Sequence, residues 1–145
     1  YIYIAGGNIN ITSENDGIQA ETILKISGGT ITVSSGGGSE NASANSSGEW
    51  NLSWKFAGGS LSESTSGTLE ESGKGLKSAD TIKIEGGTMQ IDSADDSLHS
   101  NNAVYISGGT IKAESGDDGI HADTLLIISE KILAGNVFLG CCIFI

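Results

Sequence analysis

Short runs of alternating apolar and polar residues recur along the chain at a fixed spacing. The sequence Ile-Ser-Gly-Gly-Thr-Ile occurs at 26–31 and again at 106–111, and looser copies occur at 4–9 and 84–89. Successive Gly-Gly pairs begin 22, 58 and 22 residues apart, and the longer step equals one 22-residue period plus an insert of 36. A fixed period of this length is typical of proteins built from stacked repeats.

Alignment of the four copies on their Gly-Gly pairs places apolar residues at five shared positions. These residues are Ile2, Leu24, Ile82 and Val104; Ile4, Ile26, Ile84 and Ile106; Ile9, Ile31, Met89 and Ile111; Ile11, Val33, Ile91 and Ala113; and Ile18, Leu76, Leu98 and Ile120. Alternation with a period of two indicates β-strands. Because each coil is too small to bury its apolar side alone, stacking must supply the core.

We therefore predict an all-β fold, a right-handed parallel β-helix with 22-residue coils and three short strands per coil. The chain has no proline, which agrees with this fold because stacked strands need every backbone N–H. A β-sandwich with evenly spaced strands is the alternative, but it does not require a fixed period.

The repeat pattern also divides the chain. We expect the β-helix to cover residues 1–128, interrupted by a low-complexity insert at 36–71 and followed by an atypical apolar tail at 129–145. A long loop that leaves a solenoid at a corner costs little free energy. The tail is too short to cross a bilayer, so it establishes no membrane insertion. We expect it to be a cap on the helix end, a truncated membrane segment or sequence outside its natural frame.

The net charge narrows the choice of partners. The chain carries a formal charge of −11 at pH 7, with seven lysines and no arginine. This balance argues against nucleic acid as a partner, because nucleic-acid binding requires a basic face. It favours cations, or partners that are bridged to the protein by cations.

One corner of each coil carries the most concentrated chemistry. Asn15-Asp16, Asp95-Asp96 and Asp117-Asp118 occupy the same place in three coils, and Gly73-Lys74 occupies it in the remaining one. Adjacent coils lie about 4.8 Å apart, and two like charges at about 5 Å repel by roughly 3 kcal/mol at an effective dielectric constant of 20. Crowded carboxylates either raise their pKa values or bind a cation.

Hard oxygen ligands without nearby thiolates favour Ca²⁺ as that cation. The candidate calcium ligands are Asp95, Asp96, Asp117 and Asp118, with Asp123 and Asn101 as further oxygens and Asn15 and Asp16 at the equivalent corner of the first coil. Lys74 is expected to neutralise the ladder where an acidic residue is missing. The alternative is a solvated acidic edge that prevents aggregation.

Two histidines follow the acidic corner at equivalent positions. His99 and His121 are expected to stack on adjacent coils. Paired histidines beside aspartates can bind zinc, but two ligands are fewer than a zinc site requires. We therefore interpret them as part of an outward polar ladder with Gln19 and Lys77.

Aromatic and basic residues provide candidate sugar-binding positions. One outward ladder contains Tyr3, Lys25, Lys83 and Tyr105. This ladder is expected to face a sugar chain, with a plain solvated face as the alternative. Trp50 and Trp54 lie on the polar insert, where they either stack on sugar rings or pack within a small hairpin.

The repeated Ile-Ser-Gly-Gly-Thr-Ile, the segment 116–123 and the segment 74–80 resemble the bacterial carbohydrate-binding β-helix proteins of the cellulosome-associated type. The resemblance covers about residues 1–128. It implies a fold similar to that of pectate lyases, calcium binding, secretion or display at the cell surface, and adhesion to cellulose and pectin-like polygalacturonate. We therefore expect a calcium-dependent, non-catalytic binding protein for plant cell-wall polysaccharides.

Two other functions stay open at this point. The segment 117–121 is similar to the paired Asp and Gly-His of polygalacturonases, so a polysaccharide hydrolase or lyase is one alternative. Pectate lyases commonly use an arginine base, which this chain lacks. A structural surface adhesin without a glycan ligand is the other alternative.

Overall fold

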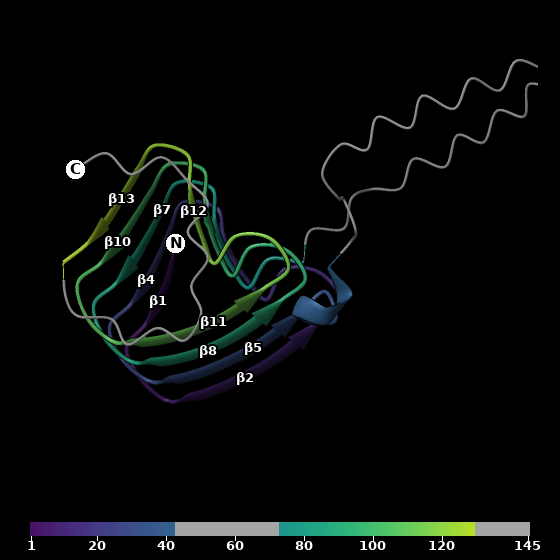
Figure 1. Cartoon of the computed structure of the whole chain (residues 1–145). Helices are drawn as coiled ribbons and strands as arrows, with labels where there is room; N and C mark the ends of the chain where they lie inside the picture. The colour runs from purple at the N-terminus through teal and green to yellow at the C-terminus, as the bar shows by residue number, and fades with distance from the viewer. Residues whose placement is uncertain (43–72, 130–145) are drawn as a thin grey trace, which may run out of the picture.

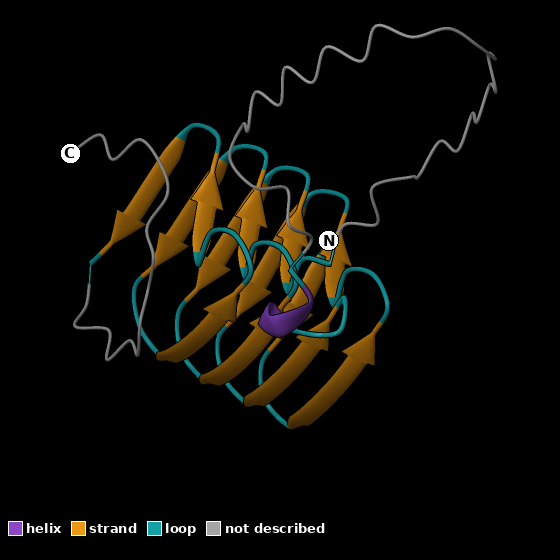
Figure 2. Cartoon of the chain, turned by 45° about the vertical axis from the view of Figure 1, so that its right-hand side comes forward, coloured by secondary structure: helices purple, strands orange, loops and turns teal. Residues whose placement is uncertain are grey.

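A computed structural model describes residues 1–42 and 73–129, which form a stack of coils (Figure 1). Three parallel sheets run along the stack, and each coil contributes one strand to each sheet (Figure 2). Sheet A contains β1 (Ile2–Ile4), β4 (Ile23–Ile26), β7 (Thr81–Ile84), β10 (Ala103–Ile106) and β13 (Leu125–Ile128). Sheet B contains β2 (Asn8–Ser13), β5 (Thr30–Ser35), β8 (Thr88–Ser93) and β11 (Thr110–Ser115). Sheet C contains β3 (Ile18–Ala20), β6 (Leu76–Ser78), β9 (Leu98–Ser100) and β12 (Ile120–Ala122).

The pairing register follows the sequence period. Ile4 pairs with Ile26, which is 22 residues later, and Ile26 pairs with Ile84, which is 58 residues later. The 36-residue insert therefore leaves the strand register unchanged. The predicted parallel β-helix with three short strands per coil is confirmed, and we number the coils from one (β1–β3) to four (β10–β12).

The inward positions of the three sheets form one continuous core. Leu24, Ile82 and Val104 stack in sheet A and are fully buried, as are their counterparts in the other two sheets. In coil one, the apolar residues of β1 and β2 pack against this core and are only partly buried, whereas Ile18 and Ala20 of β3 are buried. Since a coil has apolar neighbours only above and below it, each layer depends on the adjacent layers for burial.

Glycine conformation sets the corner between sheets A and B. The second glycine of each pair, such as Gly29 or Gly87, has a φ between +93° and +99°, which residues with a side chain rarely adopt. Three further glycines of positive φ, Gly36 to Gly38, carry the chain out of coil two into a 3₁₀ turn at Ser39–Asn41. Asp92 fixes this exit, because its Oδ1 accepts the Ser39 backbone N–H at 2.7 Å. No helix within the described residues is long and apolar enough to span a membrane.

Candidate functional site

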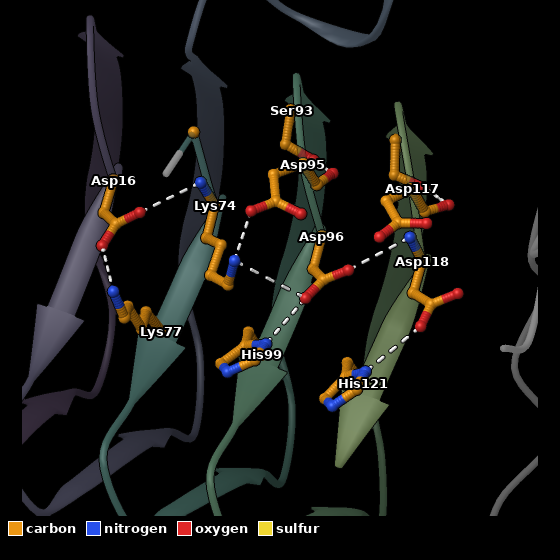
Figure 3. A network of polar contacts seen from close by, with 12 residues as sticks. Asp16, Lys74, Lys77, Ser93, Asp95, Asp96, His99, Asp117, Asp118 and His121 are labelled. Atoms are coloured by element: carbon orange, nitrogen blue, oxygen red, sulfur yellow. Dashed lines mark hydrogen bonds and ion pairs between the residues drawn. The ribbon is translucent and has the colours of Figure 1, made fainter. Parts of the chain in front are cut away.

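The corner between sheets B and C carries a ladder of charged side chains (Figure 3). Asp16, Lys74, Asp96 and Asp118 occupy equivalent places in coils one to four. Two of the carboxylates accept a backbone N–H from the coil above. The Lys74 N–H donates to Asp16 Oδ1 at 3.0 Å, and the Asp118 N–H donates to Asp96 Oδ1 at 3.1 Å. These carboxylates therefore join adjacent coils where the strand ladder is interrupted.

Asp96 is the most deeply buried carboxylate of this ladder, with 4% of its surface exposed. Its second oxygen, Oδ2, lies 2.6 Å from His99 Nδ1. Burial alone would raise the pKa of Asp96, but the hydrogen bonds from His99 and from the Asp118 N–H, together with the Lys74 charge, lower it. Asp96 is thus held as a carboxylate inside the corner.

The ammonium of Lys74 reaches upward, toward coil three. It forms an ion pair with Asp95 and lies 3.8 Å from Asp96 Oδ2. Asp16, in the coil below, is paired instead with Lys77, whose Nζ donates to Asp16 Oδ2 at 2.9 Å. The two lysines that coil two places at this corner, Lys74 and Lys77, therefore neutralise different neighbouring coils.

Three of the expected calcium ligands are brought together. One carboxylate oxygen from each of Asp95, Asp96 and Asp117 lies within 4.8 Å of the others. Partial burial and the charges of Asp118, Asp96 and Asp95 raise the pKa of Asp117. The raised pKa shows that one ammonium does not balance the negative charge here. The donor set consists of hard oxygens, which fits Ca²⁺ better than a softer metal.

A second outward feature lies on sheet A. Tyr3, Lys25, Lys83 and Tyr105 pair in register on successive strands, as the sequence predicts. The Lys25 ammonium lies 5.7 Å from the centre of the Tyr3 ring, and the Lys83 ammonium lies 5.8 Å from that of Tyr105. The result is a ladder of two cation–π pairs that faces outward.

The two histidines stack as predicted. The ring centroids of His99 and His121 are 4.8 Å apart and their planes differ by 10°. His121 Nδ1 lies 3.1 Å from Asp118 Oδ2, and His121 Nε2 lies 3.0 Å from Asp123 Oδ1. Burial lowers the pKa of His121, but these two carboxylate contacts outweigh it and raise the pKa overall.

Comparison with known proteins identifies the family. A family model described as carbohydrate-binding domain-containing protein matches residues 1–119, which cover most of the chain. The chain belongs to this carbohydrate-binding domain family. Neither the curated proteins nor the solved structures provide a match. The matched range includes the acidic corner and the whole Tyr/Lys ladder, so both features are part of the family domain.

The remaining expected ligands of this carbohydrate-binding domain have other partners. Asp118 and Asp123 contact His121, and Asn101 Oδ1 lies 3.0 Å from His99 Nε2. The backbone oxygen of Asn15 accepts the Ser13 hydroxyl. Trp50 and Trp54 lie outside the described residues. Sequence analysis missed the histidine contacts, although the spacing Asp-x-x-His-x-Asn/Asp at 96–101 and 118–123 signals them.

Proposed function

We propose that this carbohydrate-binding domain is a non-catalytic, calcium-dependent binding module for plant cell-wall polysaccharides, in particular acidic polymers of the polygalacturonate type, with cellulose as a second ligand. The Tyr/Lys ladder on sheet A is the observation that carries the proposal. It combines two features that an acidic glycan requires, namely ammonium groups for its carboxylates and aromatic faces for its sugar rings.

The periodicity of the ladder supports binding along the axis of the β-helix. Coils repeat about every 4.8 Å, a distance comparable with the length of one sugar ring in a polymer. Lys25 and Lys83 are adjacent rungs at the middle of the ladder, and Tyr3 and Tyr105 are the outer rungs. A glycan that runs along the axis meets one rung per sugar, with its carboxylates opposite the two lysines.

The side chains of the ladder are held in place before any ligand binds. The Tyr3 hydroxyl lies 2.9 Å from the Ser27 hydroxyl, and the Lys25 ammonium lies 2.8 Å from Glu85 Oε1. Restricting these side chains in advance reduces the entropy that binding would otherwise cost. Tyr3 nevertheless exposes 54% of its surface, which leaves the ring free for contact.

Calcium acts, in this proposal, at the acidic corner and on a different side of the coil. Asp95, Asp96 and Asp117 would hold the ion, which supplies positive charge where the carboxylates crowd. The ion would bind coil three to coil four and so keep the upper rungs of the ladder in register.

The assignment as a non-catalytic protein follows from how the acidic groups are used. The buried carboxylate Asp96 accepts hydrogen bonds from Asp118 and His99, and Asp16 accepts them from Lys74 and Lys77. Such partners stabilise the stack of coils, whereas a glycosidase aims two carboxyl groups at one substrate. Because the proposed ligand is a cell-wall polymer, we place the protein outside the cell, secreted or on the cell surface.

Retention on immobilised polygalacturonate and on cellulose, in excess Ca²⁺ and in chelator, tests the proposal. The double variant Lys25→Gln/Lys83→Gln should lose calcium-dependent retention. The control is Lys112→Gln, which removes one positive charge from sheet B, where Lys112 is paired with exposed Glu114; each single variant, Lys25→Gln and Lys83→Gln, is compared with it. Reducing or unsaturated ends in the supernatant would move the assignment to a hydrolase or lyase. Folded protein that is retained by neither polymer would favour a structural adhesin.

A further inference from the structure

His99 and His121 are held by the same arrangement of side chains in two successive coils. Nδ1 of each ring faces the aspartate three residues earlier, at 2.6 Å from Asp96 and 3.1 Å from Asp118. Nε2 of each ring faces a side-chain oxygen two residues later, at 3.0 Å in both coils. The motif is therefore repeated as a unit, and the stacked rings keep their edges aligned.

The contacts at the Nε2 edge of each ring differ from those at the Nδ1 edge. A carboxylate only accepts hydrogen bonds, so each Nδ1 must carry the proton that is donated to Asp96 or Asp118. Nε2 of a neutral imidazole then presents a lone pair, and it faces the oxygen of Asn101 or Asp123. A positive centre or a proton between nitrogen and oxygen makes such a contact favourable. A second ring proton would supply it at His121, and the Asn101 amide could turn its NH₂ toward His99. A metal ion held by both rings is the arrangement that would satisfy the two Nε2 edges together.

We propose that the Nε2 edges of His99 and His121 form a binding site for a divalent transition-metal ion of the Zn²⁺, Ni²⁺ or Cu²⁺ class, with Asp123 and Asn101 as oxygen ligands. Imidazole nitrogens with one carboxylate suit these metals. Asp96 and Asp118 then serve as the carboxylates behind the ligands, because a metal-bound histidine usually donates its other N–H to such a group and is oriented by it.

Each of the two histidines has a nitrogen within 4.8 Å of one on the other ring, and closure around an ion requires the rings and Asp123 to move inward. The ring centroids are 4.8 Å apart and the planes are nearly parallel, so the two Nε2 atoms lie about one coil spacing apart. Tetrahedral zinc with Zn–N bonds of about 2.0–2.1 Å needs the nitrogens roughly 3.3 Å apart, so the rings must tilt toward each other by about 1.5 Å. Asn101 and Asp123 are exposed, which leaves room for this movement and for entry of the ion.

This site is distinct from the calcium site in its donors and in its place. The proposed calcium ligands, Asp95, Asp96 and Asp117, lie at the corner that precedes the histidines. Asn101 and Asp123 lie two residues after the histidines, along the chain toward sheet A. Coils one and two carry Gln19 and Lys77 in the histidine register, so among the described residues only coils three and four present two imidazoles. Asp96 is the residue that the two sites share, as a calcium ligand and as the carboxylate that orients His99.

Titration of the protein with Zn²⁺ by calorimetry, and with Co²⁺ by visible absorption, tests the proposal in the presence of saturating Ca²⁺. We expect one ion per chain and Co²⁺ bands that report nitrogen ligation. His99→Gln and His121→Gln should each weaken Zn²⁺ binding by about 100-fold, and Asp123→Asn by about tenfold. Glutamine is the natural residue at this register in coil one, as Gln19 shows, so the fold accepts it.

Glu114→Gln is the matched control, since it removes an exposed carboxylate from sheet B of coil four and should leave Zn²⁺ affinity unchanged. Absence of Zn²⁺ binding to the folded protein overturns the proposal. Binding that survives both histidine substitutions also overturns it. Loss of binding in Asp96→Asn but not in Asp123→Asn would place the ion at the Nδ1 edges and refute the ligand set. Asp123→Asn changes an exposed side chain, so it remains a valid test even if a histidine variant does not fold.

Discussion

The backbone N–H of Asp118 donates a hydrogen bond to the carboxylate of Asp96 in the coil below, with 3.1 Å between nitrogen and Oδ1. The same carboxylate binds His99 through its other oxygen and is almost fully buried. Asp96 is thus a structural bond between coils three and four, in a corner where the strands do not pair. This double role makes it the residue of the acidic corner on which stability depends most.

We expect Asp96→Ala to lower the free energy of unfolding by about 3 kcal/mol, because a buried charged hydrogen-bond acceptor is lost and its donors are left unpaired. Denaturant unfolding in chelator measures the change. Asp117→Asn is the comparison, because the raised pKa of Asp117 indicates that its charge opposes folding. This variant should keep or slightly increase the stability, and a loss equal to that of Asp96→Ala would contradict the distinction.

Removal of the Lys74 ammonium should raise the affinity for Ca²⁺ but lower the stability of the ion-free protein. Lys74 is already paired with Asp95 and lies 3.8 Å from Asp96, so it repels a cation at the same carboxylates. Lys74→Gln should increase Ca²⁺ affinity on the order of tenfold, since two like charges about 4 Å apart interact by roughly 1–4 kcal/mol. Unfolding in chelator should become easier.

Calorimetric titration with Ca²⁺ measures the affinity, and Lys112→Gln again controls for the loss of one positive charge. Unchanged affinity in Lys74→Gln would show that the ion does not bind at Asp95, Asp96 and Asp117.

Packing at the acidic corner follows a size rule between adjacent coils. A Cβ at Gly75 would overlap the side chain of Ile91 and also the backbone oxygen of Ser97, which would have to shift. One coil later Ser97 stands in place of Gly75, and the residue that replaces Ile91 is Ala113. Glycine at the corner is therefore paired with the large Ile91 in the next coil, and serine at the corner is paired with the small Ala113.

Gly75→Ser alone should destabilise the protein by about 1–3 kcal/mol through overpacking, and Ile91→Ala alone by about 2–5 kcal/mol through a cavity. The double variant reproduces the arrangement of Ser97 and Ala113, so it should be less destabilised than the sum by at least about 1 kcal/mol. Denaturant unfolding of all four proteins gives this coupling. Gly6→Ala, where no atom lies within 4 Å of the added Cβ, should change stability by less than about 0.5 kcal/mol. Strict additivity would refute the size rule.

Stability should depend on pH through two groups with opposite signs. The raised pKa of His121 means that its contribution is fully present below about pH 6.5 and is lost as pH rises through the folded-state pKa. The lowered pKa of Asp96 means that its contribution is present above about pH 4 and is lost as pH falls further. We therefore expect maximum stability between about pH 4 and 6.5.

The Tm of the wild-type protein and of His121→Gln, measured from pH 5 to pH 9 in chelator, tests the histidine part. The wild-type Tm should fall relative to that of the variant as pH rises above 6.5. Parallel curves across this range would show that His121 does not contribute in its charged form.

The sequence predicts the stack of coils because the Gly-Gly pairs and the inward apolar residues share one period. Each inward position is decided by alternation, and the repeated Gly-Gly motif is enough to pair Ile26 with Ile84 across the insert. The ladder of Tyr3, Lys25, Lys83 and Tyr105 follows for the same reason, since outward residues at equal positions must align.

Side-chain partners at the acidic corner could not be predicted in the same way. The period places Asp118 beside Asp96 and Asp117, but the rotamer of Asp118 aims its carboxylate at His121. Lys74 could equally have reached down to Asp16, and its length allows it to reach up to Asp95. Which partner each side chain contacts depends on its torsion angles and on competing partners, and the repeat period does not encode either.

The uneven spacing of the coils gives the folding reaction a direction. Within residues 76–128, each pairing of one strand with the next in its sheet closes a loop of one 22-residue period. The pairing of β4 with β7 must close a loop of 58 residues. The longer closure costs roughly 0.9 kcal/mol more in chain entropy. We therefore expect coils three and four, with β6, to form first and residues 1–35 to dock onto them afterwards. The insert would thus separate an earlier-folding part of the chain from a later-folding part, although the three sheets run through both parts without a break.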